Sequence, residues 1–192
     1  MENLHKPVMI NEIISFLPSN KSINVIDATF GAGGYSKPIL KKFNVKQLLA
    51  IDRDPISKIF SKQIESKYSN FTLINEKFSK IDEIISNSKL EDKKFDIIIF
   101  DLGISSNQID NAKRGFSFNK DGPLDMRMGS AEKNAYEIIN KYEEKNLAEI
   151  IYQYGEERYS RIIAKEIVKN RKIKLISNTI ELSNIVKKCI PI

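Results

Sequence analysis

Apolar and polar positions follow two alternating periods along the first hundred residues of the chain. Short continuous apolar runs, typical of strands buried on both faces of a parallel sheet, are separated by segments with apolar positions at helical spacing. The predicted strands cover residues 23–27, 47–51, 71–74 and 95–100, and the predicted helices cover residues 8–17, 36–43, 55–66 and 81–88. Because right-handed crossovers connect parallel strands, this alternation predicts an α/β fold with about four parallel strands in a doubly wound sheet.

The pattern changes after Asp101. Residues 103–129 are rich in Gly, Asp, Asn and Ser, which is typical of a loop. The remaining residues favour helices only, over residues 135–142, 147–154, 158–169 and 179–189. We therefore predict two parts: residues 1–110 with the sheet, and residues 111–192 with the loop and a basic helical domain.

Positive charge is concentrated in the last fifth of the chain. Residues 155–192 contain nine Lys or Arg and four acidic residues, and so supply five of the six net positive charges. Such a region suits a polyanion such as nucleic acid, although a solvated helix face in a lysine-rich protein explains it equally well. The same two interpretations stay open for Tyr152, Tyr154 and Tyr159, which lie beside Arg158 and Arg161.

Composition argues against several classes of protein. No run approaches the roughly twenty apolar residues of a membrane helix, and the first residues do not resemble a secretion signal. The single Cys189 cannot form an internal disulfide, and with only His5 beside it a thiolate or histidine zinc site is ruled out. We expect a cytoplasmic protein without a metal, in which His5 is a structural donor rather than a general base.

A glycine cluster joins the first predicted strand to its helix. Gly31, Gly33 and Gly34 follow the acid Asp27, and Asp52 ends the next strand 25 residues later. Glycines let a backbone approach a ligand closely, and an acid at the position of Asp52 accepts hydrogen bonds from the ribose of an adenosine cofactor. The spacing Gly-x-Gly-Gly, with no Gly-Lys-Ser/Thr, argues against both nicotinamide dinucleotides and nucleoside triphosphates.

The residues after the fourth strand are polar where a substrate would meet the sheet. They are Asp101, Ser105, Ser106, Asn107 and Gln108. Further along, residues 114–118 and 121–128 mix aromatic, arginine and acidic side chains, which suits stacking on an unpaired base. The alternative is an ordered surface loop with its Phe and Met side chains packed beneath it.

Taken together, these segments resemble the bacterial MraW/RsmH family. Members methylate the exocyclic N4 of a cytosine in small-subunit (16S) ribosomal RNA. The resemblance covers residues 5–9, 27–36, 52–55, 101–110, 114–118, 122–128 and 154–158. It implies a Rossmann-like sheet that binds S-adenosylmethionine, a helical insertion domain, and ribosomal RNA or the small ribosomal subunit as partner.

The resemblance also implies which residues bind and react. S-adenosylmethionine contacts fall on Gly33, Gly34, Tyr35, Asp52, Phe78, Asp101 and Gln108. Tyr35 stands where the family commonly has histidine. Our hypothesis for catalysis is that Asp101 or a nearby loop carbonyl accepts a hydrogen bond from the cytosine amino group while Ser105 and Ser106 position the base, with no metal required.

Family members continue well past residue 192. We therefore expect a fragment that stops inside the helical insertion, lacks the last sheet strands and exposes residues 95–100 as an apolar sheet edge. Two rival functions remain: an inactive cofactor- or RNA-binding fragment, and a nicotinamide-dependent oxidoreductase. A homodimer is left open.

Overall fold

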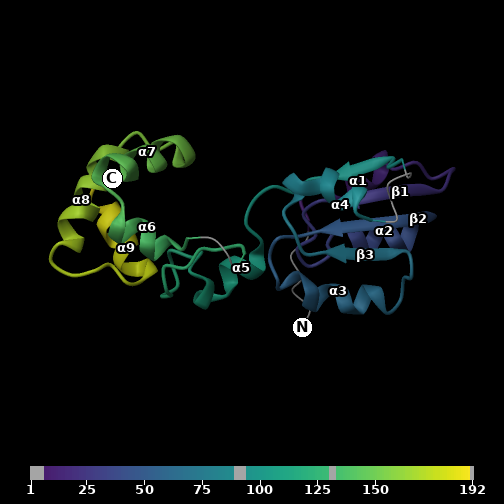
Figure 1. The fold of residues 1–192 in the computed structure, drawn as a ribbon, viewed down its shortest axis with the longest axis horizontal. Helices are drawn as coiled ribbons and strands as arrows, with labels where there is room; N and C mark the ends of the chain where they lie inside the picture. Colours follow the sequence, from purple (N-terminus) through teal and green to yellow (C-terminus); the bar gives the residue numbers. More distant parts are fainter. Residues whose placement is uncertain (1–6, 89–93, 130–132, 191–192) are drawn as a thin grey trace. The chain divides into compact units, whose positions relative to one another are not determined.

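The computed structural model describes residues 7–88, 94–129 and 133–190. The chain forms two compact units, which divide between Gly103 and Ile104 (Figure 1). The boundary predicted from the sequence lies between residues 110 and 111, so residues 104–110 fall in the second unit of the structure and in the first predicted part. His5 lies outside the described residues.

The first unit is built on a parallel sheet with the strand order β3-β2-β1-β4 in the described part of the chain (Figure 1). The strands are β1 (Ile23–Asp27), β2 (Val45–Ile51), β3 (Phe71–Ile74) and β4 (Ile97–Ile99). The chain adds β2 and β3 on one side of β1 and then returns to the other side as β4. A reversal of this kind opens a crevice at the carboxyl ends of the central strands. The predicted α/β, Rossmann-like fold is confirmed.

Helices cover both faces of this sheet. They are α1 (Ile10–Phe16), α2 (Ser36–Lys42), α3 (Ser57–Glu65), the short 3-10 turn η1 (Phe78–Lys80) and α4 (Ile81–Ser86). Successive strand residues point to opposite faces, so Val25 and Leu48 pack with apolar side chains of α1, α2 and α3. Ile26 and Leu49 face the other way and pack with the isoleucines of α4.

β4 is shorter than the predicted strand over residues 95–100. Before it, the Asp96 N–H donates to the Asn24 carbonyl at 2.9 Å, but the Asn24 N–H donates to the Asp96 carboxylate at 2.8 Å, so a side chain supplies one of the two bonds there. The same carboxylate accepts a hydrogen bond from Lys21 Nζ at 2.7 Å. Within the described residues β4 pairs only with β1. Ile98 and Phe100 are each 50% exposed, which confirms the predicted apolar edge.

The second unit begins with a helix that the sequence analysis placed in a loop. Helix α5 (Ser106–Asp110) is followed by the 3-10 turn η2 (Ala112–Arg114). The Ser105 hydroxyl accepts a hydrogen bond from the Gln108 backbone N–H at 3.3 Å, and the Gln108 side chain accepts one from the Ser105 N–H at 2.9 Å. This reciprocal capping box fixes the start of α5, and its Ser-x-x-Gln spacing was the overlooked signal.

In the described part of this unit, four further helices share one apolar core. They are α6 (Ala135–Lys141), α7 (Glu144–Gly155), α8 (Ser160–Arg171) and α9 (Thr179–Lys187). Leu147, Ile163 and Ile185 are buried in it, and Cys189, just after α9, is buried beside them. The Arg171 guanidinium donates to carbonyl oxygens at the end of α6 and so joins α8 to α6.

The loop before α6 folds tightly against its own backbone. A Cβ on Gly115 would lie 2.0 Å from the Pro123 carbonyl oxygen, and one on Gly122 would lie 1.9 Å from that of Ala112. The Thr179 hydroxyl donates to the Lys120 carbonyl at 2.7 Å and accepts from the Gly122 N–H at 3.2 Å. The loop is therefore fastened to the start of α9.

The sequence left two interpretations of this loop: its apolar side chains pack beneath it, or they stack on an unpaired base. The side chains differ in which interpretation they fit. Leu124 is fully buried in the helical core and anchors the loop. Phe118, in contrast, is 67% exposed and Met126 is 39% exposed. Packing therefore explains Leu124, whereas Phe118 is exposed and the proposal that it contacts a base stays open.

Candidate cofactor site

The glycine loop after β1 is hydrogen-bonded to β4 and β2 and has open space at Gly31. The Ala28 N–H donates to the Ile99 carbonyl at 2.9 Å, and the Phe30 N–H donates to the Ile51 carbonyl at 3.0 Å. Gly31 and Gly33 have φ angles of +56° and +81°, which L side chains rarely adopt. A Cβ on Gly31 would meet no atom within 4 Å, so the loop leaves space at this residue.

Asp52 fastens the next strand to this loop. Its Oδ2 accepts the Gly31 N–H at 2.6 Å, and its Oδ1 accepts the Asp54 N–H at 2.8 Å. Burial raises the pKa of the Asp52 carboxyl above its usual value, and the two backbone hydrogen bonds oppose this shift. A carboxylate has about four acceptor positions, so two backbone bonds leave room for two ribose hydroxyls.

Asp27 is a fully buried acid at the end of β1. Its Oδ2 accepts the Ser36 hydroxyl at 2.6 Å, and the Thr29 N–H lies 3.4 Å from Oδ1. Burial raises the pKa of Asp27 to about 6; the bonds from Ser36 and Thr29 lower it, and the charges of Asp52 and Asp101 raise it. A carboxyl with a strongly raised pKa beside a ligand crevice is typical of a functional site.

Asp101 completes a line of three acids at the carboxyl ends of β1, β2 and β4. Its backbone N–H donates to the Thr29 hydroxyl at 2.7 Å, which ties the end of β4 to the glycine loop. Its side chain is exposed. Asp101 therefore presents an acceptor to solvent, whereas Asp27 is closed off beneath the loop.

Two exposed phenylalanines lie together at the same end of the sheet. Phe78 opens η1 and Phe100 follows β4, and their ring centroids are 5.4 Å apart in an edge-to-face arrangement. They are 39% and 50% exposed. An exposed aromatic pair offers an apolar, polarisable surface for a flat heterocycle such as adenine.

Gly34 and Tyr35, two further predicted cofactor contacts, lie against the N-terminal segment. A Cβ on Gly34 would lie 2.4 Å from Pro7 Cγ, so glycine is needed for the N-terminal segment to pass. The Tyr35 ring is buried, its hydroxyl donates to the Val8 carbonyl at 2.6 Å, and burial raises the pKa of this phenol. The Tyr35 side chain thus holds the N-terminal segment, which leaves its backbone for any cofactor contact.

Ser105, Ser106 and Gln108 belong to the second unit. Ser105 and Gln108 form the capping box of α5, and Gln108 is buried. Ser106 is the first residue of α5 and is partly exposed. Cofactor contact by Gln108 and catalysis by the two serines stay predictions.

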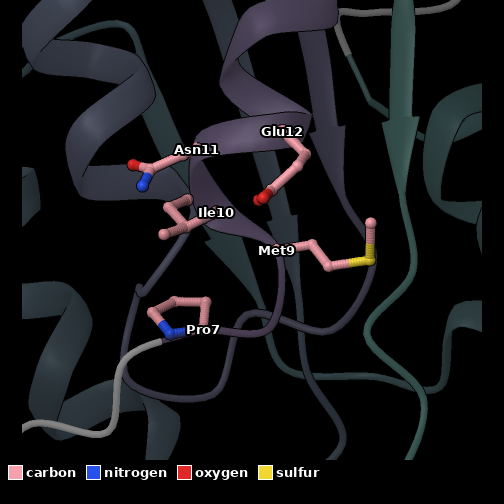
Figure 2. Close-up of a pocket in the computed structure, with 5 residues that line it drawn as sticks. All are labelled: Pro7, Met9, Ile10, Asn11 and Glu12. Atoms are coloured by element: carbon pink, nitrogen blue, oxygen red, sulfur yellow. The ribbon is translucent and has the colours of Figure 1, made fainter.

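A separate hollow lies at the start of α1. It has a volume of about 310 Å³ and is lined by Pro7, Met9, Ile10, Asn11 and Glu12 (Figure 2). Figure 2 shows the Glu12 carboxylate on the same side of the helix as Met9. None of the three acids at the strand ends lines this hollow, so it is not the candidate site.

The described residues contain no helix with the length and apolar character needed to cross a membrane. Nor do they contain three or more His, Cys, Asp or Glu side chains grouped so that they could hold a metal ion.

Comparison with known proteins decides the family. A model described as the MraW methylase family matches residues 2–192. The chain belongs to the MraW methylase family. This agrees with the resemblance inferred from its motifs.

Curated relatives are each named "Ribosomal RNA small subunit methyltransferase H". The relative from Caldicellulosiruptor saccharolyticus is 44% identical over 189 residues, which cover 97% of this chain and 61% of the relative. The relative from Rickettsia bellii is 46% identical over 192 residues, covering 99% and 61%. The relative from Buchnera aphidicola is 48% identical over 189 residues, covering 97% and 60%. This MraW-family chain thus spans about 61% of the length of the relatives it matches.

Two residues of this site were missed in the sequence analysis. Asp27 was noted only as a strand-end acid, because sequence gives no measure of burial. Phe100 was assigned to the apolar strand, and its contact with Phe78 joins residues that are 22 positions apart. Position along the chain was the usable signal. Asp27 is the last residue of β1 and Phe100 directly follows β4, and ligands bind at the carboxyl ends of such parallel strands.

Proposed function

We propose that this chain carries the S-adenosylmethionine-binding part of a methyltransferase that acts on the exocyclic N4 of a cytosine in small-subunit (16S) ribosomal RNA. The observation that carries the proposal is the open glycine loop bonded to the Asp52 carboxylate, within a chain of the MraW methylase family. The ribosomal RNA substrate is supported by the name of the relatives, "Ribosomal RNA small subunit methyltransferase H". The N4 position rests on the resemblance of the motifs, and a cytoplasmic location stays a prediction.

The residues present fit S-adenosylmethionine. Asp52 keeps two acceptor positions for a ribose diol, and Phe78 with Phe100 offers an apolar surface for adenine. Gly31 leaves space for close approach. When bound, S-adenosylmethionine supplies an electrophilic methyl group on a sulfonium whose C–S electron pair stays with sulfur as the methyl departs.

In this proposal Asp101 acts on the nucleophile. The cytosine amino nitrogen is a poor nucleophile because its lone pair is delocalised into the ring. The exposed Asp101 carboxylate accepts a hydrogen bond from this amino group, which favours its pyramidal form, and takes up the proton that the nitrogen releases after the N–C bond forms. Because the displacement is in-line, the main contribution of the chain is alignment of the two reactants.

Asp27 has a different part in the same proposal. Its bond to Ser36 ties the end of β1 to the start of α2, so the glycine loop is held at both ends. With a pKa of about 6, Asp27 is largely ionised at neutral pH despite complete burial. It thereby adds negative potential beneath the site of a cationic sulfonium.

Calorimetric titration with S-adenosylmethionine, and with a nicotinamide dinucleotide as control, tests the cofactor class. We expect saturable binding of S-adenosylmethionine alone, weakened about tenfold or more by Asp52→Asn, since hydrogen bonds to a charged group are worth about 1.5–3 kcal/mol. Binding of the nicotinamide cofactor, or of neither cofactor by folded protein, contradicts the proposal.

Transfer of a labelled methyl group to 16S ribosomal RNA tests the reaction. We expect Asp101→Asn to reduce transfer about a hundredfold or more, the usual scale for loss of a proton acceptor. Full transfer by this variant would show that Asp101 is not the acceptor. Cofactor binding with no transfer by the unaltered chain would instead favour the rival function, a cofactor-binding piece without activity of its own.

A further inference from the structure

The exposed face of α8 carries a row of positive side chains, which we call the basic stripe. Its members are Arg158, Arg161, Lys165, Lys169 and Lys172, all of them exposed. Within α8 itself, the spacing of four residues places Arg161, Lys165 and Lys169 along one side of the helix, while Arg158 lies in the turn before α8 and Lys172 directly follows it. From Arg161 to Lys172 the helix rises about 16 Å, enough to run beside several nucleotides of a single strand.

Most of this charge is not neutralised within the unit. Lys169 lies 3.4 Å from the Glu166 carboxylate, an exposed pair that contributes little. Among the described residues neither Arg161 nor Lys165 has an ion-pair partner. Arg171, in contrast, points its guanidinium at the end of α6. The structure therefore separates a structural arginine, Arg171, from Arg161 and Lys165, which have no ion-pair partner among the described residues.

Exposed tyrosines precede the stripe along the chain. Tyr152 and Tyr154, in the last turn of α7, are 63% and 83% exposed. Tyr159 instead packs against the helical core. Packing thus explains Tyr159 but not the other two. Because four residues of extended chain span at most about 14 Å, the Cα atoms of Tyr154 and Arg158 lie within that distance of each other.

We propose that the basic stripe, together with Tyr154, binds single-stranded RNA. The cations would follow the phosphates, and the Tyr154 ring would stack on an unpaired base, a pairing of features that is typical of single-strand binding. This inference rests on the proposed function in one respect: it assigns the RNA of that reaction to a surface of the second unit.

Fluorescence anisotropy with the whole chain tests it, using a fluorescein-labelled single-stranded RNA of about twelve nucleotides. The double variant Arg161→Glu with Lys165→Glu should bind about tenfold more weakly or worse. Between about 50 and 200 mM salt, the slope of log affinity against log salt should fall by about 1.4, or 0.7 for each lost phosphate contact.

Lys58→Glu with Lys62→Glu is the matched control. These lysines are exposed on α3 at the same spacing and give the same change in net charge, so affinity should stay within about twofold of the unaltered chain. Equal weakening by both pairs would show that only net charge matters and would overturn the stripe. Arg161→Gln with Lys165→Gln gives the same direction without charge reversal, should the first variant misfold.

Substitutions of Tyr154 test whether the bound RNA is single-stranded. Tyr154→Ala should weaken binding about fivefold, whereas Tyr154→Phe should retain it, because stacking needs only the ring. Equal affinity for an RNA duplex, with Tyr154→Ala unaffected, would overturn the assignment. Calorimetry with S-adenosylmethionine separates the two proposals. If the unaltered chain does not bind the cofactor, the proposed function is contradicted. If the unaltered chain binds the cofactor but not the single-stranded RNA, only the proposal for the basic stripe is contradicted.

Discussion

Both units contain a glycine-bearing loop, and the two loops use glycine for opposite reasons. At Gly31 in the first unit, a side chain would meet nothing within 4 Å. At Gly115 and Gly122 in the second unit, a Cβ would collide with backbone carbonyl oxygens of the same loop. Gly31 therefore keeps space open, whereas Gly115 and Gly122 permit close backbone approach, as Gly34 does beside Pro7 in the first unit. Glycine in a sequence does not distinguish a ligand loop from a self-packed loop; the surroundings of the missing Cβ do.

The units also differ in where they keep their charge. The first unit buries Asp27 completely and Asp52 in large part beneath the glycine loop. The second exposes the basic stripe to solvent. Buried charge costs free energy and persists where function needs it, whereas exposed charge costs little and serves long-range attraction. The two locations match a small cationic cofactor and a large polyanion.

The largest effect that we expect is for Gly115→Ala. Its Cβ would be forced against the Pro123 carbonyl, so the free energy of unfolding should fall by about 3 kcal/mol or more, measured by urea denaturation with tyrosine fluorescence. Gly31→Ala is the control, because it shares a positive φ but has open space, and should lose about 1–2 kcal/mol. Equal losses would mean that backbone conformation alone requires both glycines.

Asp27→Asn should change how stability depends on pH. The folded chain keeps the Asp27 proton up to about pH 6, whereas the unfolded chain releases it near 3.8. The stabilisation from that proton is therefore full below the lower value and is lost as pH rises through about 6. Between about pH 4 and 8 the unaltered chain should lose about 2 kcal/mol relative to the variant, measured by urea denaturation at each pH.

Asp125 in the second unit provides the opposite case. The Arg127 guanidinium holds the pKa of Asp125 below its usual value, so its stabilisation is present above the unfolded pKa and is lost as pH falls. Relative to Asp125→Asn, the unaltered chain should therefore lose stability on acidification. If the stability of the unaltered chain relative to both variants changed in the same direction with pH, the contrast between a buried acid and a paired one would be contradicted.

Thr179→Val should loosen the self-packed loop. The change removes the hydrogen bond to the Lys120 carbonyl and leaves the Gly122 N–H without its acceptor, at a cost of about 1.5 kcal/mol in the free energy of unfolding. Thr72→Val, at an exposed position on β3, should change stability by less than about 0.5 kcal/mol. If calorimetric melting detects no difference between the two variants, the loop does not depend on Thr179.

The smallest effect is expected for Phe78→Ala. Loss of one ring of the exposed pair should weaken S-adenosylmethionine binding about fivefold, close to 1 kcal/mol, in a calorimetric titration. Phe16→Ala removes a ring that is 86% exposed on α1 and should leave the affinity unchanged. Unchanged affinity in both variants would remove Phe78 from the cofactor site.

The sheet was predictable because each buried strand is a local pattern. The bounds of β1 and β3 agree with the predicted residues, and β2 begins two residues earlier than predicted. The start of β4 was not predictable, because the side-chain bonds of Asp96 to Lys21 and Asn24 join distant parts of the chain. Helix α5 was hidden in a polar stretch, where capping residues resemble loop residues.

The site was predictable in its positions but not in its energetics. Asp52 was found from its distance along the chain to Asp27, since the carboxyl ends of parallel strands share one edge. The raised pKa of Asp27 depends on complete burial, which comes from the packing of several elements at once. Likewise, Tyr152 and Tyr154 could not be separated from Tyr159 until their exposure was known.

Because Cys189 is buried, the rate at which its thiol is labelled can report on the second unit. It is the single cysteine of the sequence, its Sγ donates to the Ile185 carbonyl at 3.3 Å, and burial raises the pKa of its thiol. Alkylating reagents attack the thiolate, so modification must wait until the segment around α9 opens. The rate of thiol labelling under native conditions therefore reports the opening free energy of the segment around α9, while the sheet unit, which has no cysteine, contributes no signal.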